Sequence, residues 1–259
     1  MRKVVRRPMP LDTPARPLRT TAPELRLPPP FTLVRLREWG DAFEHARRIA
    51  PTEGAGTLVH VGRFDLAEFA LVLEPDEPLV AARRAFYAGM AALADALAAY
   101  AQPETLIDIH WPGALTVNLG LVGGGRLAWP EGTADDAVPD WLVFGGMIRT
   151  ASMSGEPGLN PSVTALEEEG FGETTAVDVV ESFARNMMVH LDAWQEKGFV
   201  GVAKSYLERL SRAGGLRSIA DNGDLLIRSP GAKETVRTDL LQALAAADWY
   251  DPATKGPRA

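Results

Sequence analysis

The stretch from Asp108 to Leu127 constrains the fold of this chain more than any other part of the sequence. Its apolar runs predict two short strands joined by a hairpin, and three consecutive glycines, Gly123, Gly124 and Gly125, open the second strand. Three glycines in a row remove every Cβ, so a ligand or another backbone can approach the main chain closely. The sequence therefore predicts a sheet with a bare patch of backbone.

Length and composition exclude several classes of protein. A chain of 259 residues is long enough for one large domain, or for one domain with a small appendage. Its net charge of -7 argues against general nucleic-acid binding, and no apolar run approaches the roughly 18–20 residues that span a bilayer. Because the chain has no cysteine, disulfides, thiolate metal sites and cysteine-acyl intermediates are excluded, which fits a cytoplasmic location.

The first 30 residues differ in composition from the rest of the chain. They are rich in arginine and proline, end in Pro28-Pro29-Pro30, and show no apolar periodicity. Such a segment buries too little surface to offset its ordering entropy, so a disordered tail is predicted for residues 1–30. The prolines also interrupt any apolar core that a signal peptide would need. A basic arm that touches a partner is the alternative.

From Phe31 onward the pattern predicts alternating helices and strands without an internal repeat. Predicted helices cover 41–50 (ending before Pro51), 78–100, 177–196, 202–210 and 238–247. The helix over 78–100 is expected to be amphipathic, because its apolar residues recur at intervals of three and four. Predicted strands cover 56–62, 68–73, 106–109, 114–117, 126–129, 141–148 and 225–228.

Several segments, in the same order, resemble the catalytic domain of biotin and lipoate protein ligases. His110-Trp111-Pro112 is similar to the family's Lys-Trp-Pro-Asn-Asp strand, and the glycine run is similar to its Lys-Val-Gly-Gly-Ile-Leu strand. The strand over 141–148 resembles Val-Ile-Gly-Ile-Gly-Ile-Asn, and 164–170 resembles Thr-Ser-Leu-x-Glu-Glu-Gly. The resemblance implies an α+β fold of the class II synthetase type, with a mixed, largely antiparallel sheet packed by helices. It places the ligase-like domain at residues 31–212 and a small C-terminal αβ appendage at 213–259.

The resemblance also implies a chemistry. Proteins of this family attach a carboxylic-acid cofactor to a lysine of a carrier protein, so the implied cofactors are ATP and biotin or lipoate. The implied partners are a small carboxylic acid and a carrier domain, with a homodimer formed through sheet edges as a further expectation. No helix-turn-helix precedes the domain, so DNA regulation is not expected.

This sequence departs from the family at the residues that handle the adenylate. The family's lysine beside the glycine pair, which offsets the repulsion between carboxylate and phosphate, falls here at Gly120 or Leu121. The family's Asn-Asp is Gly113-Ala114, and its arginine-rich loop shrinks to 62–67. Three hypotheses remain: a divergent ligase or acyltransferase, a catalytically inactive binding module, and a purely structural interaction protein. A cation within reach of the glycine run distinguishes the first from the others.

The candidate ligand-binding residues each have a structural alternative. Arg126 can hold a carboxylate with its planar fork, or form an ion pair with Glu131. His110 is a candidate base or a neutral, hydrogen-bonded strand residue, and Trp111 lines an acyl slot or packs in the core. Catalytic residues are not assigned, and the histidine spacing predicts no metal site. Arg63 and Arg149 are weaker candidates than Arg126, and the alternative for each is a solvated charge at a strand end. The predicted site comprises Arg63, His110, Trp111, Pro112, Gly123, Gly124, Gly125 and Arg126.

Overall fold

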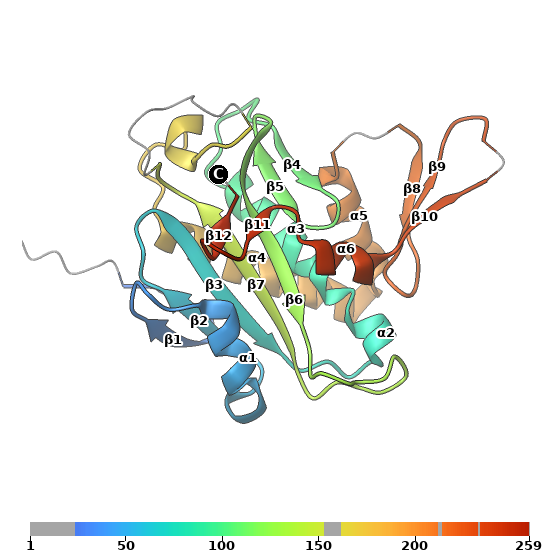
Figure 1. Ribbon diagram of the computed structural model, residues 1–259, viewed down its shortest axis with the longest axis horizontal. Coiled ribbons are helices and arrows are strands. Elements are labelled where there is room, and N and C mark those ends of the chain that lie inside the picture. The colour runs from blue at the N-terminus through green and yellow to red at the C-terminus, as the bar shows by residue number, and fades with distance from the viewer. Residues whose placement is uncertain (1–23, 153–161, 212–213, 233, 259) are drawn as a thin grey trace, which may run out of the picture.

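The computed structural model describes residues 24–152, 162–211, 214–232 and 234–258. Its centre is a seven-stranded sheet in the order β1-β2-β3-β7-β6-β5-β4, where only β1 and β2 pair in parallel (Figure 1). This mixed sheet packed by helices confirms the predicted α+β class. The strands are β1 (Thr32–Leu36), β2 (Thr57–Val61), β3 (Leu66–Leu73), β4 (Ile107–His110), β5 (Ala114–Val117), β6 (Gly120–Ala128) and β7 (Leu142–Arg149).

Three helices cover one face of the sheet, which we call the back face: α3 (Ala85–Ala98), α4 (Ala176–Lys197) and α5 (Val200–Arg209). Alternate strand residues point at these helices and form the main core, including Leu58, Phe69, Leu115 and Phe144. The predicted amphipathic helix over 78–100 is wrong in two respects. It is split into α2 (Leu79–Ala82) and α3, and 12 of the 14 residues of α3 are buried because it lies between the sheet and α4 and α5.

The other face, the front face, carries α1 (Ala42–Glu53) and a short hairpin of β11 (Tyr250–Asp251) and β12 (Gly256–Pro257), both drawn in front of the sheet in Figure 1. The Asp41 side chain caps α1 by accepting from the Glu44 N–H. The helix was predicted to end before Pro51 but continues to Glu53. Pro51 lies in the last turn, where its missing N–H removes one hydrogen bond near the helix end, and Gly54 closes the helix.

The end of the chain forms a small three-stranded sheet and then returns to the domain. That sheet has the order β10-β9-β8, and helix α6 (Leu240–Ala246) follows it. The hydroxyl of Tyr87 donates to the carbonyl of Gly223, and buried Arg83 donates to the carbonyl of Asn222, which ties the small sheet to α3. Its strands are β8 (Leu216–Ile219), β9 (Leu225–Arg228) and β10 (Val236–Thr238).

Two further expectations change with the structure. The glycine run does not open its strand but lies inside β6, which begins at Gly120. The predicted tail over 1–30 falls largely on residues 1–23, outside the described residues, whereas Leu25 is buried in the main core and the Arg26 N–H donates to Glu181. The folded domain therefore begins before Phe31, because an apolar side chain there is covered by the core. Among the described residues, no helix has the length and apolar character needed to cross a membrane.

Candidate functional site

The strand register brings residues from five strands into one row across the front face. Glu68 of β3 pairs with Met147 of β7, Met147 with Gly124 of β6, Gly124 with Ala114 of β5, and Ala114 with His110 of β4. Neighbouring strands lie about 4.8 Å apart, so the row extends over about 20 Å from Glu68 at one end to His110 at the other. Gly124 lies at the middle of this row, with apolar Met147 and Ala114 beside it and a polar residue at each end.

The three glycines permit close packing on both faces of β6. A Cβ at Gly124 would lie 2.6 Å from the ring of Trp249 and would also meet the carbonyl of Gly113. A Cβ at Gly125 would lie 2.5 Å from Met90 Sδ and 3.0 Å from the ring of Phe144, both on the back face. Of these two glycines, Gly124 is therefore the one whose missing Cβ lies on the front face, where it is buried under Trp249.

Arg126 lies two residues beyond Gly124 and so points to the same face. Its guanidinium lies between two aromatic rings, with Cζ 4.4 Å from the centroid of Phe43 and 4.1 Å from that of Tyr250. Within the described parts of the chain it makes no ion pair; Glu131, the alternative partner, lies 3.8 Å from Arg47 instead. A cation is therefore within reach of the glycine run, held in place by aromatic faces and without a carboxylate.

Arg149 is a second cation on the front face. It lies on β7 two residues beyond Met147, and it donates to main-chain carbonyls: Thr164 at 3.4 Å, Pro257 at 3.1 Å and Arg258 at 3.3 Å. Burial lowers the pKa of its guanidinium. Arg149, a weaker candidate than Arg126 from the sequence, is thus held by carbonyls near the end of the described chain, beside the glycine strand.

Arg63 is held by its own loop. The connection between β2 and β3 comprises only residues 62–65, and Arg63 Nη2 lies 2.6 Å from Asp65 Oδ2. This hydrogen bond raises the pKa of Arg63 and lowers that of Asp65. The Thr150 N–H donates to the Asp65 carbonyl, which ties the loop to the end of β7. The guanidinium of Arg63 is therefore already paired, and the loop has no length to extend over a ligand.

Glu68 is a site residue that the sequence analysis missed. Its side chain is buried on the front face, and the Ala42 N–H at the start of α1 donates to Oε1 at 2.9 Å. Burial raises the pKa of this carboxyl, and Asp41 adds to the effect, while Arg63 and Arg126 oppose it. The available signal was a single acid within the apolar strand 66–73.

His110 and Trp111 are consecutive and lie on opposite sides of the sheet. His110 is exposed on the front face, where its Nε2 lies 3.2 Å from Thr116 Oγ1. Trp111 stacks on Tyr87 at 5.9 Å between centroids, among the aromatic residues of the back face. The hydroxyl of Tyr206 donates to the carbonyl of Pro112 at 2.7 Å. The structure therefore brings His110, Gly124 and Arg126 to one face and leaves Trp111 and Pro112 with the helices.

The segment from Asp248 to Arg258, which we call the C-terminal segment, covers the centre of the front face. Trp249, only 4% exposed, packs with Leu66 and Met147, and Ala114 and Leu121 border this cluster. The rings of Trp249 and Tyr250 lie 5.7 Å apart. The chain's own last residues therefore lie on the bare backbone of β6.

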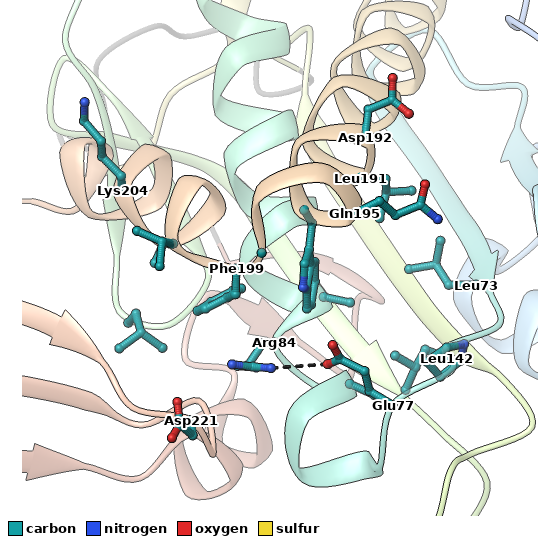
Figure 2. A pocket seen from close by; sticks show the side chains of 18 of the residues that line it. Leu73, Glu77, Arg84, Leu142, Leu191, Asp192, Gln195, Phe199, Lys204 and Asp221 are labelled. Atoms are coloured by element: carbon teal, nitrogen blue, oxygen red, sulfur yellow. Dashed lines mark hydrogen bonds and ion pairs between the residues drawn. The ribbon is translucent and has the colours of Figure 1, made fainter.

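A large open groove of about 1460 Å³ lies elsewhere, beside the C-terminal end of α4 (Figure 2). Its apolar lining includes Leu191 and Phe199, and Figure 2 shows Arg84 pointing at Glu77, with which it pairs at 3.2 Å. Arg84 also lies over the rings of Trp194 and Phe199. The groove shares none of the predicted site residues. Among the described residues, no cluster of three or more metal-ligating side chains is present.

The fold is similar to those of solved structures. A biotin protein ligase-like protein of unknown function from Silicibacter sp. TM1040 has 26% sequence identity and a TM-score of 0.73, over 85% of this chain and 99% of that chain. Biotin protein ligase from Aquifex aeolicus in complex with biotin and ATP shares the fold, with a TM-score of 0.61 at 15% identity over 80% of this chain and 94% of that chain.

Sequence comparisons lead to the same group. A biotin–acetyl-CoA-carboxylase ligase from Paracoccus denitrificans is 27% identical over 186 residues, which is 64% of this chain and 75% of the relative. The family model described as the biotin/lipoate A/B protein ligase family matches residues 27–208. This match covers well over half of the chain and contains the sheet, α3, α4 and the glycine run, so the chain belongs to the biotin/lipoate A/B protein ligase family.

Proposed function

We propose that this protein binds a small carboxylic acid of the biotin or lipoate class on the front face, over Gly124. The observation that carries the proposal is the guanidinium of Arg126, held between Phe43 and Tyr250 with no carboxylate partner among the described residues. An arginine that makes no ion pair can donate hydrogen bonds to the carboxylate of a ligand without first losing another carboxylate. The Aquifex relative, which shares the fold, is recorded in complex with biotin and ATP.

The surroundings of Arg126 suit an acid with an apolar body. Leu66, Met147, Ala114 and Leu121 border Gly124 with apolar surface, while the cation lies at one side. Burial of the apolar body stabilises the complex, and the charge-assisted hydrogen bond orients the acid.

The residues present fit an acid better than an adenylate. ATP would supply the adenylyl group that activates the acid, with pyrophosphate as the leaving group, but the β2–β3 loop has only residues 62–65, and Arg63 in it is paired with Asp65. A phosphate next to a carboxylate requires cations to offset the repulsion. Arg149 donates to main-chain carbonyls, so among the three candidate arginines only Arg126 has neither an ion pair nor a hydrogen bond within the described residues. We therefore favour an acid-binding member of the family, divergent in its chemistry, that acts in the cytoplasm with a carrier domain as partner.

Ligation of the acid to a lysine of a carrier domain is the second candidate. It is favoured by the position of Arg126 beside the glycine run, where a cation can lower the repulsion between a carboxylate and a phosphate. Acid-dependent exchange of pyrophosphate into ATP supports this candidate. Binding of the acid without such exchange supports the binding module.

Calorimetric titration with biotin, lipoate and octanoate tests the acid-binding proposal in the wild type and in Arg126→Gln. Loss of a hydrogen bond to a charged group costs about 1.5–3 kcal/mol, so the variant is expected to bind about 10- to 100-fold more weakly. Arg84→Gln is the matched control, because Arg84 also lies against two rings but is paired with Glu77. Equal affinities for the wild type and Arg126→Gln would overturn the proposal.

A further inference from the structure

The last residues of the chain are attached to the front face in a way that differs from the rest of the fold. The C-terminal segment, Asp248 to Arg258, follows α6, and the residue that caps this helix, Ala247, adopts a left-handed conformation at φ 37° and ψ 53°. Its hairpin contains two residue pairs, Tyr250 with Pro257 and Asp251 with Gly256, and forms a sheet of its own. Within the described residues, no backbone hydrogen bond joins it to a strand of the central sheet. It can therefore detach without breaking a sheet ladder.

Side-chain contacts hold the C-terminal segment in place, and they use the groups that an acid would use. The ring of Trp249 lies on Gly124 and packs with Met147, which is the apolar floor of the candidate site. The ring of Tyr250 lies over Arg126. The carbonyls of Pro257 and Arg258 accept from Arg149. Trp249 thus covers the apolar floor, Tyr250 covers Arg126, and two main-chain carbonyls bind Arg149.

These contacts are of a kind that an anionic ligand can replace. A guanidinium against a ring, or bonded to a neutral carbonyl, is held less strongly than one paired with a carboxylate. The aromatic ring of Trp249 is an internal counterpart of the apolar body of an acid. The groups of the segment that contact Arg126 and Arg149 are a neutral ring and neutral carbonyls. A carboxylate from outside would form charge-assisted hydrogen bonds with these arginines, which the segment does not provide.

We propose that the C-terminal segment is an internal occupant of the acid site and must leave Gly124 before an acid binds. The inference rests on the proposed function, because it assigns the regulation of that same site. The open form of the segment is the binding-competent form, so the observed affinity equals the intrinsic affinity multiplied by the fraction of open molecules. The ligand class is an acid with a compact ring system about the size of an indole, since that is the body the floor already accommodates.

Two measurements test the inference, using the full chain. The first is hydrogen exchange in the absence of ligand, which compares backbone amides of the C-terminal segment with those of β7. The Arg258 N–H, which donates to the Trp249 carbonyl at 2.8 Å, is expected to exchange far faster than amides of β7 and to exchange still faster when an acid is bound. Exchange as slow as that of β7 would overturn the inference, whatever the ligand result.

The second measurement is the affinity of the same acids for Trp249→Ala. Removing the ring weakens the closed form, and the variant is expected to bind biotin or lipoate about tenfold more tightly or better. Trp39→Ala is the matched control, since Trp39 is 97% exposed and far from the segment in sequence. Arg126→Gln in the Trp249→Ala chain is expected to lose the gain in affinity, which assigns the binding to the uncovered face.

The outcomes separate the inference from the proposed function. Tighter binding by Trp249→Ala with fast exchange of the segment supports both. Equal binding by the wild type and Trp249→Ala overturns the inference and leaves the acid site standing. No binding by either chain overturns the proposed function, and the inference that the segment yields its place to an acid is then overturned with it.

Discussion

The two faces of β6 meet opposite kinds of neighbours, although both are built on the same glycine run. On the back face, Gly125 lies against Met90 and the ring of Phe144, which belong to the main core. On the front face, Gly124 lies against Trp249, beside Arg126. The back face is closed by long helices from the middle of the chain, whereas the front face is closed by a hairpin of two residue pairs.

The difference shows that a bare backbone patch is not by itself a binding site. At Gly125 the missing Cβ makes room for Met90 and Phe144 of the main core, and at Gly124 it makes room for the ring of Trp249. The large groove at the end of α4 offers a second comparison, because Arg84 in it is paired with Glu77, whereas Arg126 makes no ion pair within the described residues.

Truncating one ring on each face gives the largest expected effect. Phe144→Ala removes a fully buried ring from the back face and is expected to lower the free energy of unfolding by about 3–5 kcal/mol. Trp249→Ala is expected to cost about 1–2 kcal/mol, because the loss is limited by the free energy that closes the C-terminal segment. Urea unfolding followed by circular dichroism measures both. Equal losses would mean that the two faces are equally part of the fold.

The second prediction concerns His60, a buried histidine that alternates with Val59 and Val61 and so points to the back face. Burial, with a contribution from Arg35, lowers its pKa from 6.5 to about 4. A base with a lowered folded pKa contributes stability that is complete above pH 6.5 and is lost as the pH falls from 6.5 to 4. We expect a loss of about 3 kcal/mol in the free energy of unfolding over this range.

Urea unfolding of the wild type and His60→Leu at pH 7 and pH 4 measures the contribution. The variant has no group to protonate at this position, so it is expected to lose about 3 kcal/mol less than the wild type between the two pH values. The same acid sensitivity in both chains would show that His60 is not the source of the effect.

The smallest effect is expected at Glu68 on the front face, with the opposite dependence on pH. Burial raises the pKa of this acid, so its ionised form is disfavoured in the folded protein. The wild type therefore loses stability as the pH rises above the pKa that Glu68 has in the unfolded chain. Glu68→Gln is expected to be more stable than the wild type at pH 8. The difference is expected to vanish at low pH, where both side chains are neutral. Thermal unfolding at pH 8 and pH 4 tests this, and a variant less stable at pH 8 would contradict it.

Much of the back face was predictable from local pattern. The apolar spacing over 177–196 predicted α4 within one residue at each end, because the capping box at Thr175 and Asp178 and the glycine at Gly198 mark its ends. The strand at 114–117 was also predicted as the structure has it. The short strands β1, β8 and β10 were missed, since exposed edge strands carry few buried residues and hence little periodicity.

The candidate site was only partly predictable. Gly124, Arg126 and His110 share the front face, but Trp111 and Pro112 lie in the turn between β4 and β5, where Trp111 stacks on Tyr87 and the Pro112 carbonyl accepts from Tyr206. Glu68 and Trp249 were not among the predicted residues. Glu68 reaches the row through pairing of β3 with β7, which are distant in sequence, and such pairings have no local signal.

The sequence by itself determined the family, the bare backbone at residues 123–125, the short connection within residues 62–67 and the lack of a cysteine nucleophile. These are properties of residue type, order and spacing, which the covalent chain carries wherever it folds. Only the tertiary structure decided that Arg126 lies between Phe43 and Tyr250, and that Trp249 covers Gly124. Those contacts join α1, β6 and the C-terminal segment, and non-local packing alone brings segments so far apart in sequence together.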